Sequence, residues 1–249
     1  MLIQQTIAKL RDLKLAGMAQ GFEEQLSSSV THGLAFEDRF SMLVDQEAAY
    51  RDNIRLKRLL KVARLKASAC VEDIDFNHQR GLERSQIAAL STGRWIEKGF
   101  NLILTGPTGC GKTWLACAFG NQACRQGKTV QFLRLPLLLE ELQLAHGDGS
   151  FRKKLANLAK LDLLILDDFG TAALNSQARA DMLEVFDSRV EGRSTAVTSQ
   201  IPVDRWHDYL NEGNPTVADA ILDRLVTGSQ RINMRGESMR KRAGQLDFS

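Results

Sequence analysis

The sequence lacks the features of a membrane protein and of a disulfide-stabilised domain. Its apolar runs are short: Arg134 and Pro136 interrupt the leucine-rich run near residue 133, and Asp167 ends the run that starts at residue 163. A membrane span needs roughly 18 apolar residues without such breaks. Four cysteines occur in 249 residues, and no two are spaced as Cys-x-x-Cys. We therefore expect no membrane segment, no disulfide framework and no zinc site.

The start of the chain also lacks an apolar stretch that could serve as a secretory signal, because Lys9, Arg11, Asp12 and Lys14 interrupt it. We therefore expect a cytoplasmic protein. The composition, 43% hydrophobic and 25% charged, is typical of a soluble globular chain that buries one full-sized core. This balance excludes disordered and fibrous classes of protein.

The net charge of +3 is small, but positive charge is concentrated in two segments. Residues 51–66 carry a net charge of +6 and residues 229–242 a net charge of +4, so the rest of the chain is net negative. Two such segments are typical of a protein that binds a polyanion, although a solvated face without a ligand stays open as the alternative. The candidate residues for binding such a polyanion are Arg51, Arg55, Lys57, Arg58, Lys61 and Arg64.

The chain shows two kinds of pattern. Residues 1–68 have helical spacing of apolar side chains, with a loop near residues 27–33 and a second helix over 36–66. From about residue 101, short apolar strands alternate with amphipathic helices, which is typical of a parallel sheet with right-handed crossovers. We predict a small all-helical domain over 1–68 and an α/β domain over 69–249. The expected strands are 100–105, 129–133, 161–166, 195–198 and 230–234, and the expected helices 112–126, 137–146, 151–160, 177–191, 203–210 and 216–226.

A phosphate-binding loop is the most specific motif. Residues 106–113, Gly-Pro-Thr-Gly-Cys-Gly-Lys-Thr, fit the Walker A pattern between an expected strand and an expected helix. Its glycines let backbone N–H groups surround a phosphate, Lys112 would bridge the β- and γ-phosphates, and Thr113 would bind Mg²⁺. A purely structural glycine-rich turn is the alternative. The candidate nucleotide-binding residues are Gly106, Pro107, Thr108, Gly109, Cys110, Gly111, Lys112, Thr113 and Trp114.

Two carboxylates follow the third expected strand. Asp167 and Asp168 come directly after four apolar residues, at the end of the strand where open α/β sheets bind ligands. Asp167 would hold Mg²⁺, and Asp168 would orient or deprotonate the attacking water. The alternative is that both aspartates only cap the following turn.

Two further side chains complete the predicted site. Gln200, with Ser199, follows the fourth strand and could sense the γ-phosphate, although a hydrophilic loop start would look the same. Arg224 lies in an amphipathic helix and could act as an arginine finger on a neighbouring subunit's nucleotide. A surface salt bridge to Asp219 or Asp223 is the alternative for Arg224.

Together these motifs resemble the AAA+ ATPases of the DnaA/DnaC initiator clade, and most closely the IstB family of transposition helper ATPases. The resemblance covers nearly the whole chain. Its most specific parts are residues 214–225, Asn-Pro-Thr-Val-Ala-Asp-Ala-Ile-Leu-Asp-Arg-Leu, and the Arg-Gly-Glu-Ser-Met-Arg run at 235–240. Residues 72–76, 163–170 and 198–202 add to it.

The resemblance implies a P-loop NTPase fold, with a five-stranded parallel sheet in which the strand ending at Thr198 lies between those leading to Gly106 and Asp167. It also implies ATP and Mg²⁺ bound between subunits, a homo-oligomer on duplex DNA with little sequence specificity, and a transposase partner. Arg224 then corresponds to the family's trans-acting arginine, and Ile74 and Phe76 fall in the segment that usually lines the adenine pocket.

Two departures from the wider AAA+ pattern matter for activity. Asp168 stands where most members have glutamate, so we expect slow ATP hydrolysis that duplex DNA stimulates. The residues after the fifth strand are too few for the usual C-terminal helical lid. A replicative helicase loader and an ATP-binding DNA scaffold with little turnover stay open as alternatives. A small-molecule kinase would need an acceptor pocket and a lid, and residues 128–160 show neither.

Overall fold

The computed structural model describes residues 2–28, 31–78, 80–190, 192–211, 214–236 and 239. The chain divides into two compact units, Met1–Arg58 and Leu59–Ser249; the domain limits at 68 and 69 stay a prediction. Among the described residues, no helix combines the length and apolar character needed to cross a membrane. The basic residues Arg240, Lys241 and Arg242 lie outside the described residues.

The first unit is helical, as predicted, but its first helical region is divided in two. A break at residues 13–15, where Lys14 has a φ of 61°, separates the first two helices. The elements are α1 (Leu2–Asp12), α2 (Ala16–Ser27), η1 (Thr31–Gly33) and α3 (Phe36–Ala63), whose last residues, 59–63, belong to the second unit.

Glycines hold α2 against α3. A Cβ at Gly17 would lie 2.7 Å from the Cβ of Tyr50 and 2.8 Å from the backbone oxygen of Gln46, so only glycine allows this approach. Beside it, the buried Glu47 carboxylate accepts hydrogen bonds from the backbone N–H of Met18 and from Arg51. Burial alone raises the pKa of Glu47, but these donors outweigh burial and hold the pKa below its ordinary value.

The second unit is built on a five-stranded parallel sheet of order β2-β3-β4-β1-β5. The predicted position of the Thr198 strand is confirmed, because β4 pairs with both β1 and β3. The carboxyl ends of β1, β3 and β4 therefore meet at one edge, where the chemistry-bearing residues gather. The strands are β1 (Leu102–Thr105), β2 (Val130–Arg134), β3 (Leu163–Phe169), β4 (Ser194–Ser199) and β5 (Gln230–Asn233).

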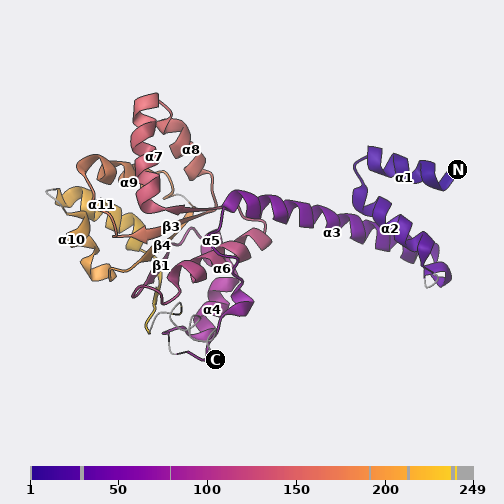
Figure 1. The fold of residues 1–249 in the computed structure, drawn as a ribbon, viewed down its shortest axis with the longest axis horizontal. Helices are drawn as coiled ribbons and strands as arrows, with labels where there is room; N and C mark the ends of the chain where they lie inside the picture. Colours follow the sequence, from indigo (N-terminus) through magenta and orange to yellow (C-terminus); the bar gives the residue numbers. More distant parts are fainter. Residues whose placement is uncertain are drawn as a thin grey trace, which may run out of the picture. The chain divides into compact units, whose positions relative to one another are not determined.

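Helices cover both faces of this sheet, and Figure 1 shows the strands between α6 and the group formed by α7 and α9. On one side, Ile165 approaches Gly120 of α6. On the other, Leu164, Leu166 and Val197 pack with buried residues of α7, α9 and α11. The helices are α6 (Lys112–Arg125), α7 (Leu135–Asp148), α8 (Phe151–Ala159), α9 (Ser176–Asp187), η3 (Val203–Arg205), α10 (Trp206–Leu210) and α11 (Pro215–Val226).

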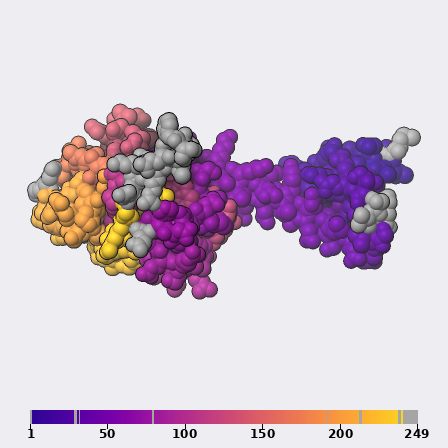
Figure 2. All heavy atoms as spheres, turned by 60° about the horizontal axis from the view of Figure 1, so that its bottom comes forward, coloured from indigo at the N-terminus to yellow at the C-terminus, as the bar shows by residue number. Residues whose placement is uncertain are grey.

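A segment that sequence patterns did not reveal precedes the sheet. It contains η2 (Val71–Asp73), α4 (Arg84–Ser91) and α5 (Arg94–Glu97), which are too short for a clear periodic signal. Gln86 donates to the backbone oxygen of Arg231 at 3.0 Å, and the N–H of Arg235 donates to the oxygen of Arg80 at 2.9 Å. Figure 2 shows the yellow surface of β5 beside the purple surface of this segment, which thus covers the edge strand of the sheet.

Candidate nucleotide-binding site

The phosphate loop joins β1 to α6, as its sequence predicts. Gly106 has a φ of 146°, and a Cβ there would lie 2.3 Å from the backbone oxygen of Met234. Gly111 precedes the first residue of α6 with a φ of 101°. Both positions require glycine, so the loop brings its backbone to the amino-terminal end of α6, where an anion is stabilised.

Lys112 lies folded onto this loop. Its Nζ donates to the backbone oxygens of Gly106 at 2.7 Å and Pro107 at 2.8 Å, and its side chain is 8% exposed. Burial lowers the pKa of the Lys112 ammonium, although the neighbouring Cys110, Asp167 and Asp168 oppose that shift. A phosphate in the loop would offer this ammonium a charged partner in place of two carbonyl oxygens.

Asp167 is the centre of the polar network. It is fully buried, and its Oδ1 accepts hydrogen bonds from the hydroxyls of Thr113 at 2.8 Å and Thr198 at 2.6 Å. Within the described part of the chain, its Oδ2 has no hydrogen-bond partner, and the Lys66 Nζ lies 3.6 Å away. A buried carboxylate oxygen without a donor, next to a threonine hydroxyl, suits Mg²⁺, which binds oxygen ligands. Thr113 and Asp167 thus fit the metal that the sequence predicts.

Asp168 has an unusual backbone conformation. Its φ of 65° is rare for a residue with a side chain, and the pairing of β3 with β4 shifts register between Leu166 and Phe169. Its N–H donates to Thr198 Oγ1, and its carboxylate accepts from Arg134 Nε at 2.8 Å. The turn thus separates the two acids, because Asp167 faces the interior while Asp168 faces Arg134 at the end of β2.

The two polar side chains at the carboxyl end of β4, Ser199 and Gln200, have different hydrogen-bond partners. Gln200 Oε1 accepts a hydrogen bond from Thr108 Oγ1 of the phosphate loop at 2.6 Å. The Ser199 hydroxyl instead donates to the backbone oxygen of Phe169 at 2.8 Å and accepts from the N–H of Ile201. Gln200 is therefore the side chain of this pair that contacts the loop.

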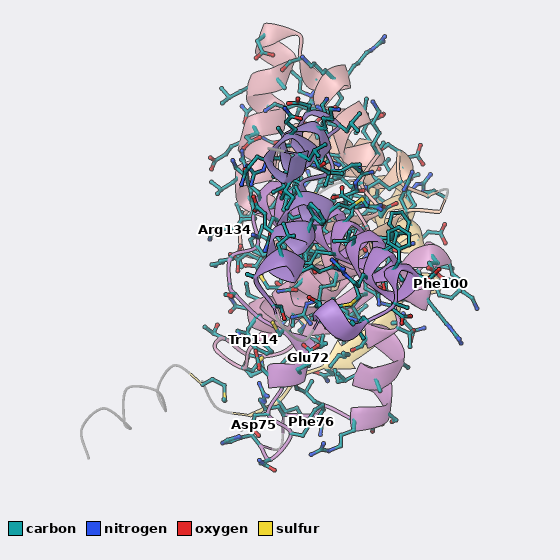
Figure 3. The ribbon with its side chains drawn as sticks, turned by 90° about the vertical axis from the view of Figure 1, so that its right-hand side faces the viewer. Glu72, Asp75, Phe76, Phe100, Trp114 and Arg134 are labelled. Carbon is teal, nitrogen blue, oxygen red and sulfur yellow. The ribbon has the colours of Figure 1, made fainter. Side chains whose placement is uncertain are left out.

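Two cavities flank the loop and share Lys66, Gly109, Lys112 and Thr113. The larger, of about 620 Å³, falls within the size range of small-molecule sites; Asp75 and Trp114, both labelled in Figure 3, line it. The smaller, of about 270 Å³, contains the carboxylate side of the site. The other residues lining the smaller cavity are Thr108, Arg134, Asp168, Thr198, Ser199 and Gln200.

The segment that the resemblance places at the adenine pocket lies beside the larger cavity. Asp73 and Asp75 line the larger cavity. Ile74 is buried, and the Phe76 ring lies under the Arg84 guanidinium at 4.5 Å. Cys110 is also buried, with its Sγ 4.0 Å from Lys112 Nζ. None of these three side chains lines either cavity.

Arg224 lies at the opposite end of β1 from the phosphate loop. The side-chain amide of Asn101, which precedes β1, donates to the backbone oxygen of Arg224 at 2.7 Å, whereas Gly106 follows β1. The Arg224 guanidinium donates to Asp187 at 2.7 Å, so the salt-bridge partner is on α9 and the predicted partners, Asp219 and Asp223, are wrong. Five residues of extended chain, about 16 Å, separate this end of β1 from the loop.

The candidate DNA-binding residues of α3 and the residue after it, Arg51, Arg55, Lys57, Arg58, Lys61 and Arg64, are all exposed. Arg51 pairs with Glu47 at 2.6 Å, so it also serves the packing of the first unit. On the opposite face of α3, Ala63 is buried and Leu56, Leu59 and Leu60 are half-buried, as the helical pattern predicts.

Three charged side chains of the site were missed in the sequence. In the sequence, Lys66 belongs only to the basic segment at residues 51–66, and no motif indicates a role for Arg80 or Arg134. The position of Arg134 at the carboxyl end of β2 could have indicated it, because the ligand-binding edge of the sheet runs past that point. Lys66 and Arg80 come from outside the sheet, and no local pattern marks them.

The comparison with known families identifies the chain. Residues 8–246 match the model of the IstB-like ATP-binding proteins of insertion sequence IS21 type. The chain belongs to this family. A protein named for ATP binding in insertion sequence IS1162 of Pseudomonas fluorescens is 54% identical over 203 residues, which cover 81% of this chain and 88% of the relative. An insertion sequence ATP-binding protein of Sinorhizobium fredii is 43% identical over 97% of this chain and 98% of its own length.

A solved structure supports the fold. The crystal structure of DnaI superposes with a TM-score of 0.59 at 23% identity and covers 74% of this chain and 98% of its own. The second unit of this IstB-like chain therefore has the P-loop fold with a five-stranded parallel sheet that its sequence predicts.

Proposed function

We propose that this IstB-like protein is an ATPase that switches DNA binding: it oligomerises on duplex target DNA and regulates a partner transposase through ATP binding and hydrolysis. One observation carries the proposal above all. The phosphate loop, the Lys112 ammonium and the buried Asp167 with its donor-free Oδ2 meet at one edge of the sheet, in a chain of a family of insertion-sequence proteins.

Each side chain of this edge has a proposed task. Lys112 neutralises the β- and γ-phosphates, while Thr113 and Asp167 hold Mg²⁺, which would neutralise charge on the same phosphates. Asp168 orients or deprotonates the attacking water, and Gln200 senses the γ-phosphate from the loop side. In the observed arrangement Arg134 pairs with the Asp168 carboxylate, so hydrolysis requires that carboxylate to leave Arg134.

Assembly is proposed to depend on Arg224. Since this residue lies beyond the far end of β1 from its own phosphate loop, it fits the role of an arginine finger that completes the site of a neighbouring subunit. Its pairing with Asp187 holds the guanidinium at the surface until that neighbour binds. ATP then links one chain's loop to the next chain's Arg224.

Duplex DNA is the proposed polyanion for the basic face of α3. Six exposed cations over residues 51–64 suit contacts to phosphates and no base-specific contact, so sequence specificity is low. Many subunits in one assembly add weak contacts together, so the affinity falls steeply with salt. Hydrolysis then weakens the interface and releases DNA or the transposase.

Sedimentation and phosphate release test this function together. With ATP, Mg²⁺ and duplex DNA, the protein is expected to form large complexes and to hydrolyse ATP faster than without DNA. Asp168→Asn should keep ATP and stay assembled on DNA. A wild-type protein that remains a single particle under all these conditions would refute the proposal.

An ATP-binding DNA scaffold with little turnover is the second candidate. The shorter acid at position 168 and its ion pair with Arg134 favour it, because both keep the carboxylate from the water. Single-turnover hydrolysis on DNA distinguishes the two: the switch requires ATP to be consumed before complexes dissociate, whereas the scaffold dissociates without consuming it.

A further inference from the structure

Arg80 is a buried cation that forms no ion pair within the described part of the chain, although the Asp75 carboxylate is near enough to interact with its charge. Its residue is 7% exposed, and its Nη2 donates to the backbone oxygen of Asp75 at 2.6 Å. Its Nε is buried without a hydrogen-bond partner, and no carboxylate of the described residues forms an ion pair with it. Burying a guanidinium in this way is costly unless an anion joins it.

The Arg80 guanidinium faces the nucleotide site. It lines the larger cavity together with Gly109, Gly111 and Lys112. A Cβ at Gly111 would lie 3.2 Å from Arg80 Nη1, so the guanidinium lies against the last glycine of the phosphate loop. That glycine precedes the first residue of α6, where backbone N–H groups already favour an anion.

The position of Arg80 is fixed relative to the loop. Its backbone oxygen accepts from the N–H of Arg235, just after β5, and its own N–H donates to the oxygen of His78 at 2.8 Å. Because β5 pairs directly with β1, the strand that leads into the loop, the same sheet holds both the loop and Arg80. The guanidinium is thus held in place before any ligand binds.

We propose that Arg80 is a phosphate-binding residue of the ATP site and contacts a phosphate that ATP and ADP share. The guanidinium presents paired N–H donors that match phosphate oxygens, and a phosphate would supply both the missing charge and the partner of Nε. The γ-phosphate is not its target, because Asp168 and Gln200 line the smaller cavity and Arg80 lines the larger one. This inference rests on ATP binding at the site proposed above.

Titration calorimetry of full-length variants with ATP and with ADP tests the proposal. Arg80→Gln is expected to weaken both nucleotides by about 10- to 100-fold, which is the usual effect of losing a charge-assisted contact. Arg84→Gln is the matched control. It removes the same charge from an exposed arginine of the same segment, which lies on Phe76, and should change both affinities less than about twofold.

Thermal unfolding separates phosphate binding from a structural role. Without nucleotide, Arg80→Gln should unfold at the wild-type temperature or above it, because the substitution removes a buried charge that lacks an ion pair and a partner for its Nε, while stabilisation by ADP should shrink. Arg80→Lys, which keeps the charge and loses the paired donors, should give an intermediate affinity.

Three results would overturn the assignment: wild-type affinity in Arg80→Gln, a loss confined to ATP, or weaker binding accompanied by a lower unfolding temperature without nucleotide in both Arg80 variants. Failure of the wild-type protein to bind ATP is a separate result. It would refute the proposed function itself, whatever the variants do.

Discussion

The two units of the chain have different interiors. In the second unit, every residue of β1 and β4 is buried, and the core contains large leucine, isoleucine and phenylalanine side chains. The described part of the first unit buries Ile7, two glycines, Ala19 and a few polar side chains, while Leu2 is 82% and Phe36 75% exposed. The second unit is therefore stabilised by burial of apolar area, and the first, helical unit by close backbone approach and one buried acid.

Because of this difference, the stability of the helical unit and the nucleotide affinity of the second unit should respond to different substitutions. Changes in the phosphate site should leave the helical unit intact, and changes at the α2–α3 contact should leave nucleotide affinity intact. An effect of either kind of change on the other unit would break the comparison.

The largest effect is expected from Lys112→Ala. Removal of the ammonium that lies on the phosphate loop should lower ATP affinity by at least about 100-fold, since a charged contact and its buried setting are both lost. Calorimetry gives the affinity. Circular dichroism should show unchanged helix content, and Lys160→Ala, an exposed lysine at the end of α8, should bind ATP as the wild type does.

Gly17→Ala should act on the helical unit alone. Its new methyl group would meet backbone atoms of Gln46 and Glu47 at 2.8 Å, which cannot move aside, so the free energy of unfolding should fall by about 1–3 kcal/mol. Urea unfolding followed by circular dichroism measures the change. Gly33→Ala is the control, because nothing lies within 4 Å of a Cβ there. A loss of ATP affinity in Gly17→Ala would contradict the independence of the units.

Charge reversal on α3 tests whether its basic face binds duplex DNA. Arg58→Glu combined with Lys61→Glu should weaken duplex DNA binding about tenfold at low salt, equally for all sequences, and should reduce the slope of log affinity against log salt by about 2. Fluorescence anisotropy at several salt concentrations checks this. Arg152→Glu with Lys153→Glu makes the same charge change on α8 and should have little effect; equal losses in both pairs would leave only net charge as the cause.

The smallest effect is a pH dependence of the helical unit. In the folded unit the pKa of Glu47 lies below its ordinary value, so its ion pair and hydrogen bonds stabilise the unit above the unfolded-state pKa, and this stability is lost as the pH falls through the folded-state pKa. Acid unfolding of the wild type should therefore show a loss of helix as Glu47 becomes protonated. Glu47→Gln should be less stable at neutral pH and lack that step; an unchanged acid profile would remove Glu47 from the account.

The P-loop fold and the centre of its site could be predicted because their signals are local. Apolar strands, the glycine spacing of the phosphate loop and Asp167 at a strand end are each visible within about ten residues. Arg80 and Lys66 could not be predicted, because only tertiary contacts bring these two side chains to the cavity beside the loop. The partner of Arg224 was missed for the same reason: Asp187 is 37 residues away in sequence.

In the helical unit the sequence was misleading at its glycines. Gly17 and Gly21 look like residues that weaken a helix, and in isolation they do so. In the structure α2 contains both: Gly17 allows the backbone of α3 to approach more closely than any side chain would, and Gly21 packs tightly against the side chains of Leu43 and Gln46. Their value depends on a helix some 25 residues further along the chain, and no single-helix pattern contains that information.

Mixing two inactive variants tests the central claim most directly. Asp168→Asn keeps Arg224 and loses the carboxylate proposed to activate water, while Arg224→Ala keeps that carboxylate and loses the arginine. If one chain's Arg224 completes its neighbour's site, each variant alone should fail to hydrolyse ATP on DNA, and their mixture should regain part of the wild-type rate. A mixture as inactive as its components, or an Arg224→Ala protein as active as the wild type, would contradict the account.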